Sequence, residues 1–280
     1  FIKEAAKKAI DDNFSHYTPV PGLLDLRRAV AEKFKRDNNL EFKPDQIVVS
    51  TGAKQSLANV CLCLLNSGDE VLLPCPYWVS YAEIIKLAEG IPIEVKSNIE
   101  SDFKVTPEEL EKSITLNTKM IIFSSPCNPS GSVYTQAELE AIARMLEKYP
   151  EIYVVSDEIY EHINFTDKHF SIGSIPSMID RTVTVNGVSK GFAMTGWRVG
   201  FIGAPLWIAK ACNKIQGQVT SATCAIAQKA TERAMLAEPR SATQKMKETF
   251  LNRRDMLIDL LNEIPGIKCN IPKGAFYVFP

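Results

Sequence analysis

The sequence has no apolar run approaching the roughly 20 residues that are needed to cross a bilayer. Its charges are nearly balanced, with 32 Lys and Arg against 33 Asp and Glu, and the net charge of −1 gives no long-range attraction for nucleic acid or anionic lipid. Residues 1–10 form an amphipathic pattern that lacks the features of a signal peptide. We therefore expect a soluble, cytoplasmic protein that binds neither nucleic acid nor membranes.

Cysteine is present without the patterns that give it a structural or metal-binding role. None of the seven cysteines belongs to a C-x-x-C pair, and an odd number cannot be fully paired within one chain. Several lie among apolar neighbours, as in residues 60–65, where a buried and inert thiol is the usual state. We expect reduced thiols and assign no metal site.

The length and the two ends suggest a divided molecule. A chain of 280 residues is long for one compact domain and short for two complete ones. It opens within a helical pattern without Met and stops inside the strand-like residues 275–280, so both ends are interpreted as cut. We expect a large domain over residues 1–240, truncated at its start, and the beginning of a smaller α+β domain over residues 241–280.

Short β-branched runs alternate with helical patterns along the chain, which is typical of an α/β sheet covered on both faces. Strands are expected at residues 47–50, 70–73, 93–95, 120–124, 153–156, 182–185 and 199–202. Helices are expected at residues 54–66, 77–88, 135–148 and 206–216, and a long amphipathic helix at residues 241–263. The seven runs could form one large sheet.

The segment 189–200, Ser-Lys-Gly-Phe-Ala-Met-Thr-Gly-Trp-Arg-Val-Gly, directly follows one of these strands. A lysine at the end of a buried strand can be partly desolvated, which lowers its pKa and leaves the free amine that attacks an aldehyde. Lys190 occupies that position, whereas most lysines of the chain are interpreted as solvated surface groups.

Two further features suggest ligand contacts at strand ends. Asp157 follows the apolar run 152–155, and a carboxylate buried at the carboxyl end of a strand requires a cationic partner, unless it only caps a helix. The turn Thr51-Gly52-Ala53 precedes a helix, whose N-terminus favours an anion. Arg198 adds a planar fork that suits phosphate, the alternative being a surface ion pair.

Four motifs in one order carry a family resemblance: residues 189–200, Asn128-Pro129-Ser130-Gly131, Asp157-Glu158-Ile159-Tyr160 and Pro76-Tyr77-Trp78. With them the chain resembles, nearly end to end, the class I aminotransferases of fold type I, the aspartate aminotransferase family, and most of all its bacterial subgroup. The resemblance implies a large, mostly parallel sheet with helices on both faces. It also implies pyridoxal 5'-phosphate as cofactor and amino-group exchange between an amino acid and a 2-oxo acid by a Schiff-base, ping-pong mechanism.

The resemblance assigns catalytic roles to matching residues. Lys190 corresponds to the Schiff-base lysine, which also moves a proton between the substrate Cα and the cofactor. Asp157 corresponds to the partner of the pyridine nitrogen. Tyr160 and Asn128 correspond to the residues that bond the cofactor phenolate oxygen, although each alone could be an ordinary core tyrosine or turn asparagine.

The remaining cofactor contacts follow in the same way. Phosphate donors are expected from Ser189, Arg198, Gly52 and Ala53, and Trp78 matches the aromatic residue that stacks on the pyridine ring unless it is plain core. Tyr17 matches a tyrosine that reaches the phosphate of the neighbouring subunit, which implies a homodimer with shared active sites; a locally packed loop tyrosine is the alternative. The family's cis bonds imply cis Cys75-Pro76 and Asn128-Pro129.

Substrate assignment depends on one side chain in this chain. Lys54 follows the phosphate turn, and the bacterial subgroup uses a lysine there to recognise a distal carboxylate, which favours L-aspartate with 2-oxoglutarate. A helix lysine pointing into solvent is the alternative. The arginine that binds the substrate α-carboxylate in this family is expected beyond Pro280.

Other functions remain open on the sequence. An aromatic or broad-specificity aminotransferase, or a fold-type I lyase, would use the same cofactor residues, since substrate orientation decides which bond breaks. An aminotransferase-like sensor domain is a non-enzymatic alternative, although no helix-turn-helix pattern or basic stripe is present. A nicotinamide dehydrogenase is disfavoured, because Gly196, Gly200 and Gly203 lack the G-x-G-x-x-G spacing.

Overall fold

The computed structural model describes residues 1–166, 168–236 and 241–280. Its centre is a seven-stranded sheet in the order β1-β7-β6-β5-β4-β2-β3. Neighbouring strands are parallel except β7, which runs antiparallel to both β1 and β6. The strands are β1 (Ile47–Ser50), β2 (Glu70–Pro74), β3 (Ile91–Val95), β4 (Thr118–Ser124), β5 (Tyr153–Asp157), β6 (Thr182–Gly187) and β7 (Gly200–Gly203). The seven predicted strands and the α/β class are confirmed, with ends shifted by up to two residues.

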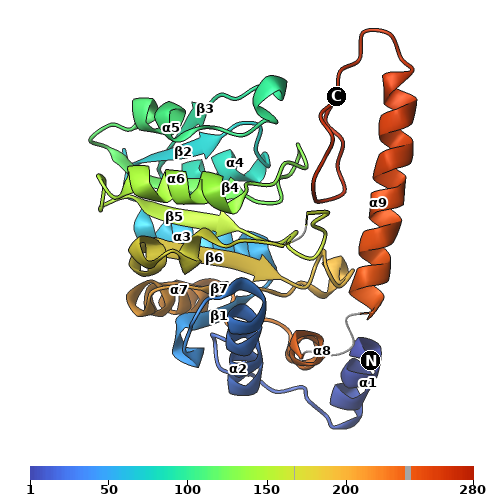
Figure 1. Ribbon diagram of the computed structural model, residues 1–280. Helices are drawn as coiled ribbons and strands as arrows, with labels where there is room; N and C mark the ends of the chain where they lie inside the picture. The colour runs from blue at the N-terminus through green and yellow to red at the C-terminus, as the bar shows by residue number, and fades with distance from the viewer. Residues whose placement is uncertain (167, 237–240) are drawn as a thin grey trace.

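Helices cover both faces of this sheet (Figure 1). They are α1 (Ile2–Asp11), α2 (Leu24–Lys33), α3 (Ala53–Leu64), α4 (Ser80–Leu87), α5 (Pro107–Ser113), α6 (Gln136–Leu146), α7 (Leu206–Val219), α8 (Ala225–Met235) and α9 (Ser241–Asn262). The five predicted helices are present. Sequence reasoning missed α2, α5 and α8; α5 carries a capping box, in which Thr106 and Glu109 bond each other's backbone N–H groups.

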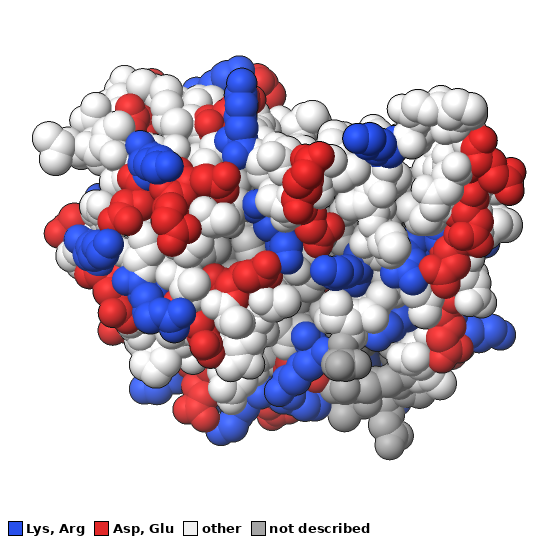
Figure 2. All heavy atoms as spheres, turned by 45° about the horizontal axis from the view of Figure 1, so that its top comes forward, with Lys and Arg blue, Asp and Glu red and all other residues white. Residues whose placement is uncertain are grey.

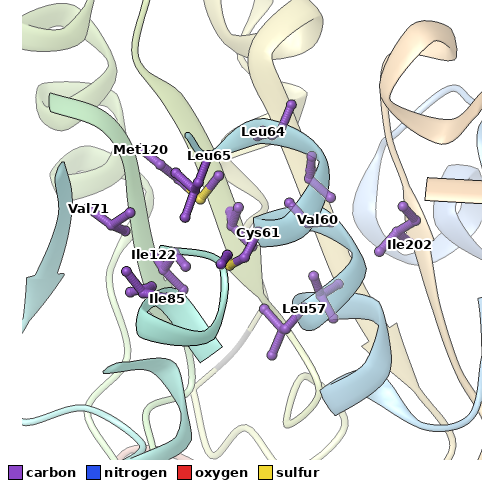
Figure 3. Packing of buried hydrophobic residues seen from close by; sticks show 14 of the residues in the cluster. Leu57, Val60, Cys61, Leu64, Leu65, Val71, Ile85, Met120, Ile122 and Ile202 are labelled. Atoms are coloured by element: carbon purple, nitrogen blue, oxygen red, sulfur yellow. The ribbon is translucent and has the colours of Figure 1, made fainter. Parts of the chain in front are cut away.

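The inner strands are buried on both faces because helices pack against each side, whereas the edge strand β3 is partly exposed. In β4, Met120 and Ile122 point into one core layer, while Ile121 and Phe123 point into the other. Figure 3 shows the first layer, where Leu57 and other apolar residues of α3 lie over the sheet. The sheet and the helices packed on it hold the strand ends, and the polar groups that these ends carry, in fixed positions.

The described part of the chain presents a mixed surface and one long outer helix. Figure 2 shows Lys and Arg interspersed with Asp and Glu on the face in view, in keeping with the balanced charge. Among the described residues, no helix is both long and apolar enough to span a membrane. Helix α9 lies at the edge of the molecule, and the chain after it folds back between α9 and the strand ends (Figure 1).

Candidate active site

A cavity of about 310 Å³ lies at the carboxyl ends of the central strands. Adjacent strands β4, β5 and β6 all run toward it, which is where open α/β sheets bind ligands. Nine of the eleven predicted site residues line it: Ala53, Lys54, Trp78, Asn128, Asp157, Tyr160, Ser189, Lys190 and Arg198. The fold therefore brings together residues that are up to 145 positions apart, from Ala53 to Arg198.

The two other predicted residues lie apart from that lining. Gly52 is not part of the lining. Its φ of +85° favours glycine, and a Cβ there would come within 2.5 Å of the Arg198 guanidinium. Tyr17 is 98% exposed and lines a different hollow, beside Phe14 and Cys224. Within a single chain Tyr17 is thus not a cavity residue, and its contact with a neighbouring subunit stays a prediction.

Asp157 is buried at the floor of the cavity. Its Oδ2 accepts a hydrogen bond from Tyr81 Oη at 2.7 Å, and its Oδ1 accepts one from the Ile159 N–H at 3.2 Å. Burial raises the pKa of Asp157 to about 6, although both hydrogen bonds oppose that rise. Because no ion pair to Asp157 is found among the described residues, this carboxylate is suited to a cationic ligand group.

Lys190 faces Asp157 across the cavity. Burial lowers the pKa of its ammonium, and the charge of Arg198 lowers it further against the opposing effect of Asp157. Lys190 Nζ lies 5.5 Å from the ring centroid of Tyr160 and 5.4 Å from that of Phe276. A partly desolvated amine enclosed by aromatic rings is chemically suited to nucleophilic attack on a carbonyl.

Tyr160 forms the wall between these groups. It is buried, and burial raises the pKa of its hydroxyl well above the ordinary value, so the phenol is protonated at neutral pH. Asn128 lines the same cavity as Tyr160. The Tyr160 Oη also lies 2.6 Å from Tyr277 Oη, a contact that sequence reasoning did not anticipate.

A cradle for an anion lies at the opposite end of the cavity. Helix α3 begins at Ala53, and the first N–H groups of a helix are suited to binding an anion, although the Gly52 N–H itself donates to the Ser50 carbonyl at 2.8 Å. Ser189 and Arg198 stand on the adjacent side, and Arg198 is held by donating to the Thr195 carbonyl at 2.8 Å. Gly200 makes this close approach possible, because a Cβ there would lie only 2.2 Å from Ala53 N.

Behind the Asp157–Tyr160 turn lies a buried ionic network. Glu158 accepts hydrogen bonds from Asn38 Nδ2 at 2.9 Å and from His169 Nε2 at 2.8 Å. Glu161 is paired with Lys33, whose charge holds the pKa of Glu161 at about 2 although burial acts in the opposite direction. Ligand atoms of Glu158, Glu161 and His169 lie within 4.8 Å of one another, but the Lys33 ammonium already supplies the balancing positive charge.

The structure adds cavity residues that sequence reasoning missed: Tyr81, Ser124, Ile159, Thr195 and Tyr277. Tyr81 belongs to α4 and Ser124 ends β4, so each carries a signal for secondary structure and none for a site. The predicted cis bonds at Cys75-Pro76 and Asn128-Pro129 are confirmed, and Ser125-Pro126 is a further cis bond. All seven cysteines are free thiols.

Comparison with known proteins gives the same family along the whole chain. The profile described as "Aminotransferase class I and II" matches residues 1–280. The aspartate/prephenate aminotransferase of Cereibacter sphaeroides is 47% identical over 281 residues, covering 100% of this chain and 70% of that protein.

Solved structures show the same relationship. The aspartate aminotransferase from Rhizobium meliloti superimposes with a TM-score of 0.97 at 39% identity, covering 99% of this chain and 70% of that one. The aromatic aminotransferase from Pyrococcus horikoshii gives a TM-score of 0.96 at 42% identity, covering 99% and 74%. With its fold, its motifs and a profile match over every residue, the chain belongs to the class I and II aminotransferases of fold type I.

Proposed function

We propose that this aminotransferase uses pyridoxal 5'-phosphate and exchanges the amino group of L-aspartate with 2-oxoglutarate in a ping-pong reaction. The observation that carries the cofactor assignment is the placement of Asp157, Lys190 and the anion cradle around one cavity. When bound, the cofactor supplies an aldehyde for amino groups and an electron-withdrawing ring. The pathway context is amino-acid metabolism.

The residues present fit this cofactor at both of its ends. A buried carboxylate without an ionic partner matches a protonated ring nitrogen, and Asp157 is that group. The cradle of Ser189, Arg198 and the N-terminus of α3 at Ala53 matches a phosphate dianion. Trp78 on the cavity wall offers a flat apolar surface for an aromatic ring.

The chain's own groups would then perform the proton transfers. Lys190 has a lowered pKa, so its amine can bond the aldehyde and can carry a proton to or from the substrate Cα. Asp157 would hold a proton on the ring nitrogen by ionic attraction. Tyr160 and Asn128 would donate hydrogen bonds to the ring oxygen, and the buried ring of Tyr160 and the partly exposed ring of Phe276 would limit the access of water to Lys190.

Lys54 supports an acidic substrate. It lines the cavity, lies 4.8 Å from the Trp78 ring centroid, and has no ion pair within residues 1–166, 168–236 and 241–280. A cation at the cavity wall that contacts an aromatic ring but has no ion pair among the described residues can bind a distal carboxylate. The names of the relatives point to aspartate, prephenate and aromatic substrates, and Lys54 favours the acidic choice.

The same proposal includes a homodimer with shared sites. An aromatic side chain that is 98% exposed, such as Tyr17, is suited to burial against a second subunit. Sedimentation should give a dimer. A mixture of Tyr17→Ala and Lys190→Ala proteins should regain activity, because heterodimers then contain one intact site; a fully active monomer would refute this part.

The cofactor assignment is tested by absorption spectroscopy and peptide mapping. Added pyridoxal phosphate should give a visible band, and borohydride should fix the label on Lys190 alone. Labelling at another lysine, or no band, would refute the assignment. Exchange kinetics separate the lyase alternative, because only an aminotransferase regenerates its starting form with a second oxo acid.

A further inference from the structure

The residues 269–280, here called the strap, close one side of the active-site cavity although they are remote from it in sequence. Tyr277 lines the cavity, and the ring centroid of Phe276 lies 5.4 Å from Lys190 Nζ. The strap backbone is tied to the central loops, since the Ala275 N–H donates to the Ile163 carbonyl at 2.7 Å and the Gly274 N–H to the Gly131 carbonyl at 2.9 Å. The strap is therefore part of the site wall.

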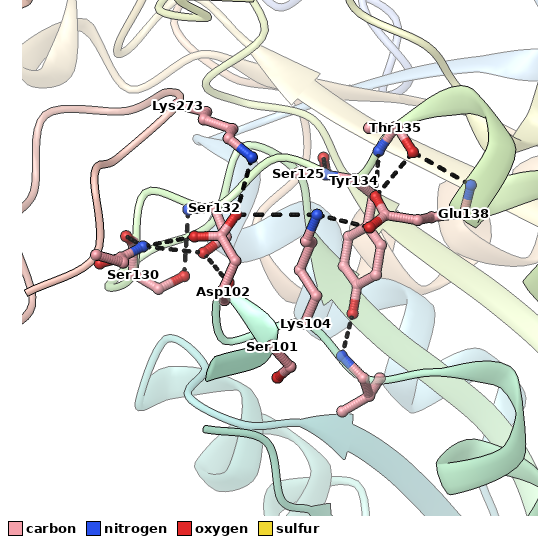
Figure 4. Close-up of polar contacts among 12 residues, drawn as sticks. Ser101, Asp102, Lys104, Ser125, Ser130, Ser132, Tyr134, Thr135, Glu138 and Lys273 are labelled. Carbon is pink, nitrogen blue, oxygen red and sulfur yellow. Dashed lines mark hydrogen bonds and ion pairs between the residues drawn. The ribbon is translucent and has the colours of Figure 1, made fainter. Parts of the chain in front are cut away.

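Asp102 anchors the start of the strap, as Figure 4 shows. Its Oδ1 accepts from Asn270 Nδ2 at 3.0 Å, and its Oδ2 lies 3.4 Å from Lys273 Nζ and 3.8 Å from Lys104 Nζ. Asp102 has a φ of +55°, in the left-handed region, so its carboxylate is presented from a tight turn. The anchor lies outside the cavity lining and can be altered without touching it.

The contact between Tyr277 and Tyr160 has only two proton arrangements. In one, Tyr160 donates to Tyr277, and its single proton is no longer available to the cavity. In the other, Tyr277 donates to the Tyr160 oxygen, and the Tyr160 proton can point into the cavity. Because Tyr160 and Tyr277 both line the cavity, a ligand acceptor there can take the Tyr160 proton, which favours the second arrangement.

We propose that Tyr277 is a positioning residue for Tyr160: its hydroxyl donates to the Tyr160 oxygen and directs the Tyr160 proton toward the ligand. The strap, anchored at Asp102, holds Tyr277 in the position from which it donates. This rests on the proposed function, in which Tyr160 contacts the ring oxygen of pyridoxal phosphate. It follows that docking of the strap and the hydrogen-bonding state of the cofactor site are linked.

A double-mutant cycle tests the proposal with Tyr277→Phe, Tyr160→Phe and the double variant. Phenylalanine keeps the ring contact, whose centroids are 5.7 Å apart, and removes only the hydroxyl. Tyr277→Phe should lower kcat by about 2- to 10-fold, the effect of one neutral hydrogen bond, and shift the pH midpoint of the visible band. In the Tyr160→Phe background the second substitution should change neither quantity. Tyr149→Phe, whose hydroxyl bonds Glu111 far from the cavity, is the control.

Additive effects in both backgrounds, or an unchanged band midpoint in Tyr277→Phe, would overturn the role of Tyr277. If the parent protein forms no band with pyridoxal phosphate, the proposed function fails instead. If the band forms but Tyr160→Phe leaves it unchanged, only the inference fails. Cofactor affinity of each variant gives a readout that is independent of turnover.

The anchor provides a second variant that leaves every cavity side chain in place. Asparagine tolerates a left-handed backbone, so Asp102→Asn should fold while losing its attraction for Lys273 and Lys104. We expect faster hydrogen exchange at the Gly274 and Ala275 N–H groups and a band shift in the same direction as Tyr277→Phe. A normal band with a loosened strap would separate the strap from the cofactor site and refute the linkage.

Discussion

The hydroxyl of Tyr81 donates a hydrogen bond to Asp157, with 2.7 Å between Oη and Oδ2. Both side chains are buried, and burial together with the Asp157 charge raises the pKa of Tyr81 well above its ordinary value, so Tyr81 remains the donor. The bond fixes the orientation of the carboxylate and favours its ionised form. Asp157 is thus held in place for a cationic ligand by a residue of α4.

The raised pKa of Asp157 predicts a cost to the cofactor-free protein. A carboxyl group whose folded pKa is about 6, against 3.8 ordinarily, contributes stability below pH ~4 that is lost as the pH rises through about 6. Asp157→Asn removes this titration. Urea unfolding without cofactor should show that the parent loses on the order of 3 kcal/mol more than the variant over this range. Exposed Asp25→Asn should follow the parent; parallel curves for Asp157→Asn would contradict the assignment.

The same substitution should separate binding from catalysis. An amide cannot provide the charge that holds a proton on the cofactor ring nitrogen, so Asp157→Asn should lower the transamination rate by at least a few orders of magnitude. The phosphate cradle is remote from this end, and cofactor should still bind. Stopped-flow kinetics on cofactor-loaded variant would reveal the loss; a near-parental rate would reduce Asp157 to a structural role.

The site residues that could be predicted from the sequence are those that belong to a motif or lie at the end of a predicted strand. Asp157 follows an apolar run and Lys190 a β-branched run, both typical of buried strands, and parallel topology brings their ends together. Tyr81 and Tyr277 were missed because each fits ordinary secondary structure: Tyr81 lies on the buried face of α4, and Tyr277 lies in a strand-like apolar stretch. Their role depends on contacts 76 and 117 residues away, which no local pattern encodes.

The fold shows the same limit. Helix α3 buries large apolar residues such as Leu57, Val60 and Leu64 and was predicted, whereas the buried face of α8 consists mainly of small alanines together with Gln228 and Thr231. Gln228 is explained only by the structure, since it donates to the Thr223 carbonyl and accepts from the Leu23 N–H. A buried polar residue whose hydrogen-bond partners are distant backbone groups is not part of a periodic apolar pattern, so such a pattern cannot predict its burial.

The close contact of Gly200 with the anion cradle predicts a specific loss of cofactor affinity. In Gly200→Ala the new methyl would lie 2.2 Å from Ala53 N, so the turn that presents the helix N-terminus must shift. We expect weaker binding of pyridoxal phosphate by at least tenfold. Gly196→Ala, in the turn that precedes β7 and with no atom within 4 Å of its Cβ, should bind like the parent. Equal affinities measured by titration of the visible band would contradict this role of Gly200 in the cradle.

The buried pair Lys33 and Glu161 predicts a large effect on stability. Both side chains are under 5% exposed, so Lys33→Met would leave a buried carboxylate without its counter-ion, at a cost of about 3 to 5 kcal/mol. Lys35→Met removes an ammonium whose partner, Glu41, is equally exposed to solvent, and should cost at most about 1 kcal/mol. Denaturant unfolding at neutral pH compares the two. Similar losses would mean that the buried network does not stabilise the Asp157–Tyr160 turn.

Substrate choice is the most direct test of Lys54. Because its ammonium lines the cavity beside Trp78 without an ion pair in the described part of the chain, it can bind the side-chain carboxylate of aspartate. Lys54→Ala should raise the KM for aspartate far more than that for phenylalanine, since a charged hydrogen bond is worth about 1.5 to 3 kcal/mol, or roughly 10- to 150-fold.

The comparison must keep the cofactor contacts intact, because Lys54 adjoins the anion cradle at Ala53. Cofactor affinity is therefore measured first, and Lys54→Met serves as a variant that retains the length of the side chain over Trp78 while removing the charge. If both variants lose aspartate and keep phenylalanine, Lys54 selects acidic substrates through its charge. If the aspartate to phenylalanine preference stays unchanged in both, the acidic-substrate proposal is wrong, and an aromatic or broad-specificity aminotransferase becomes the better assignment.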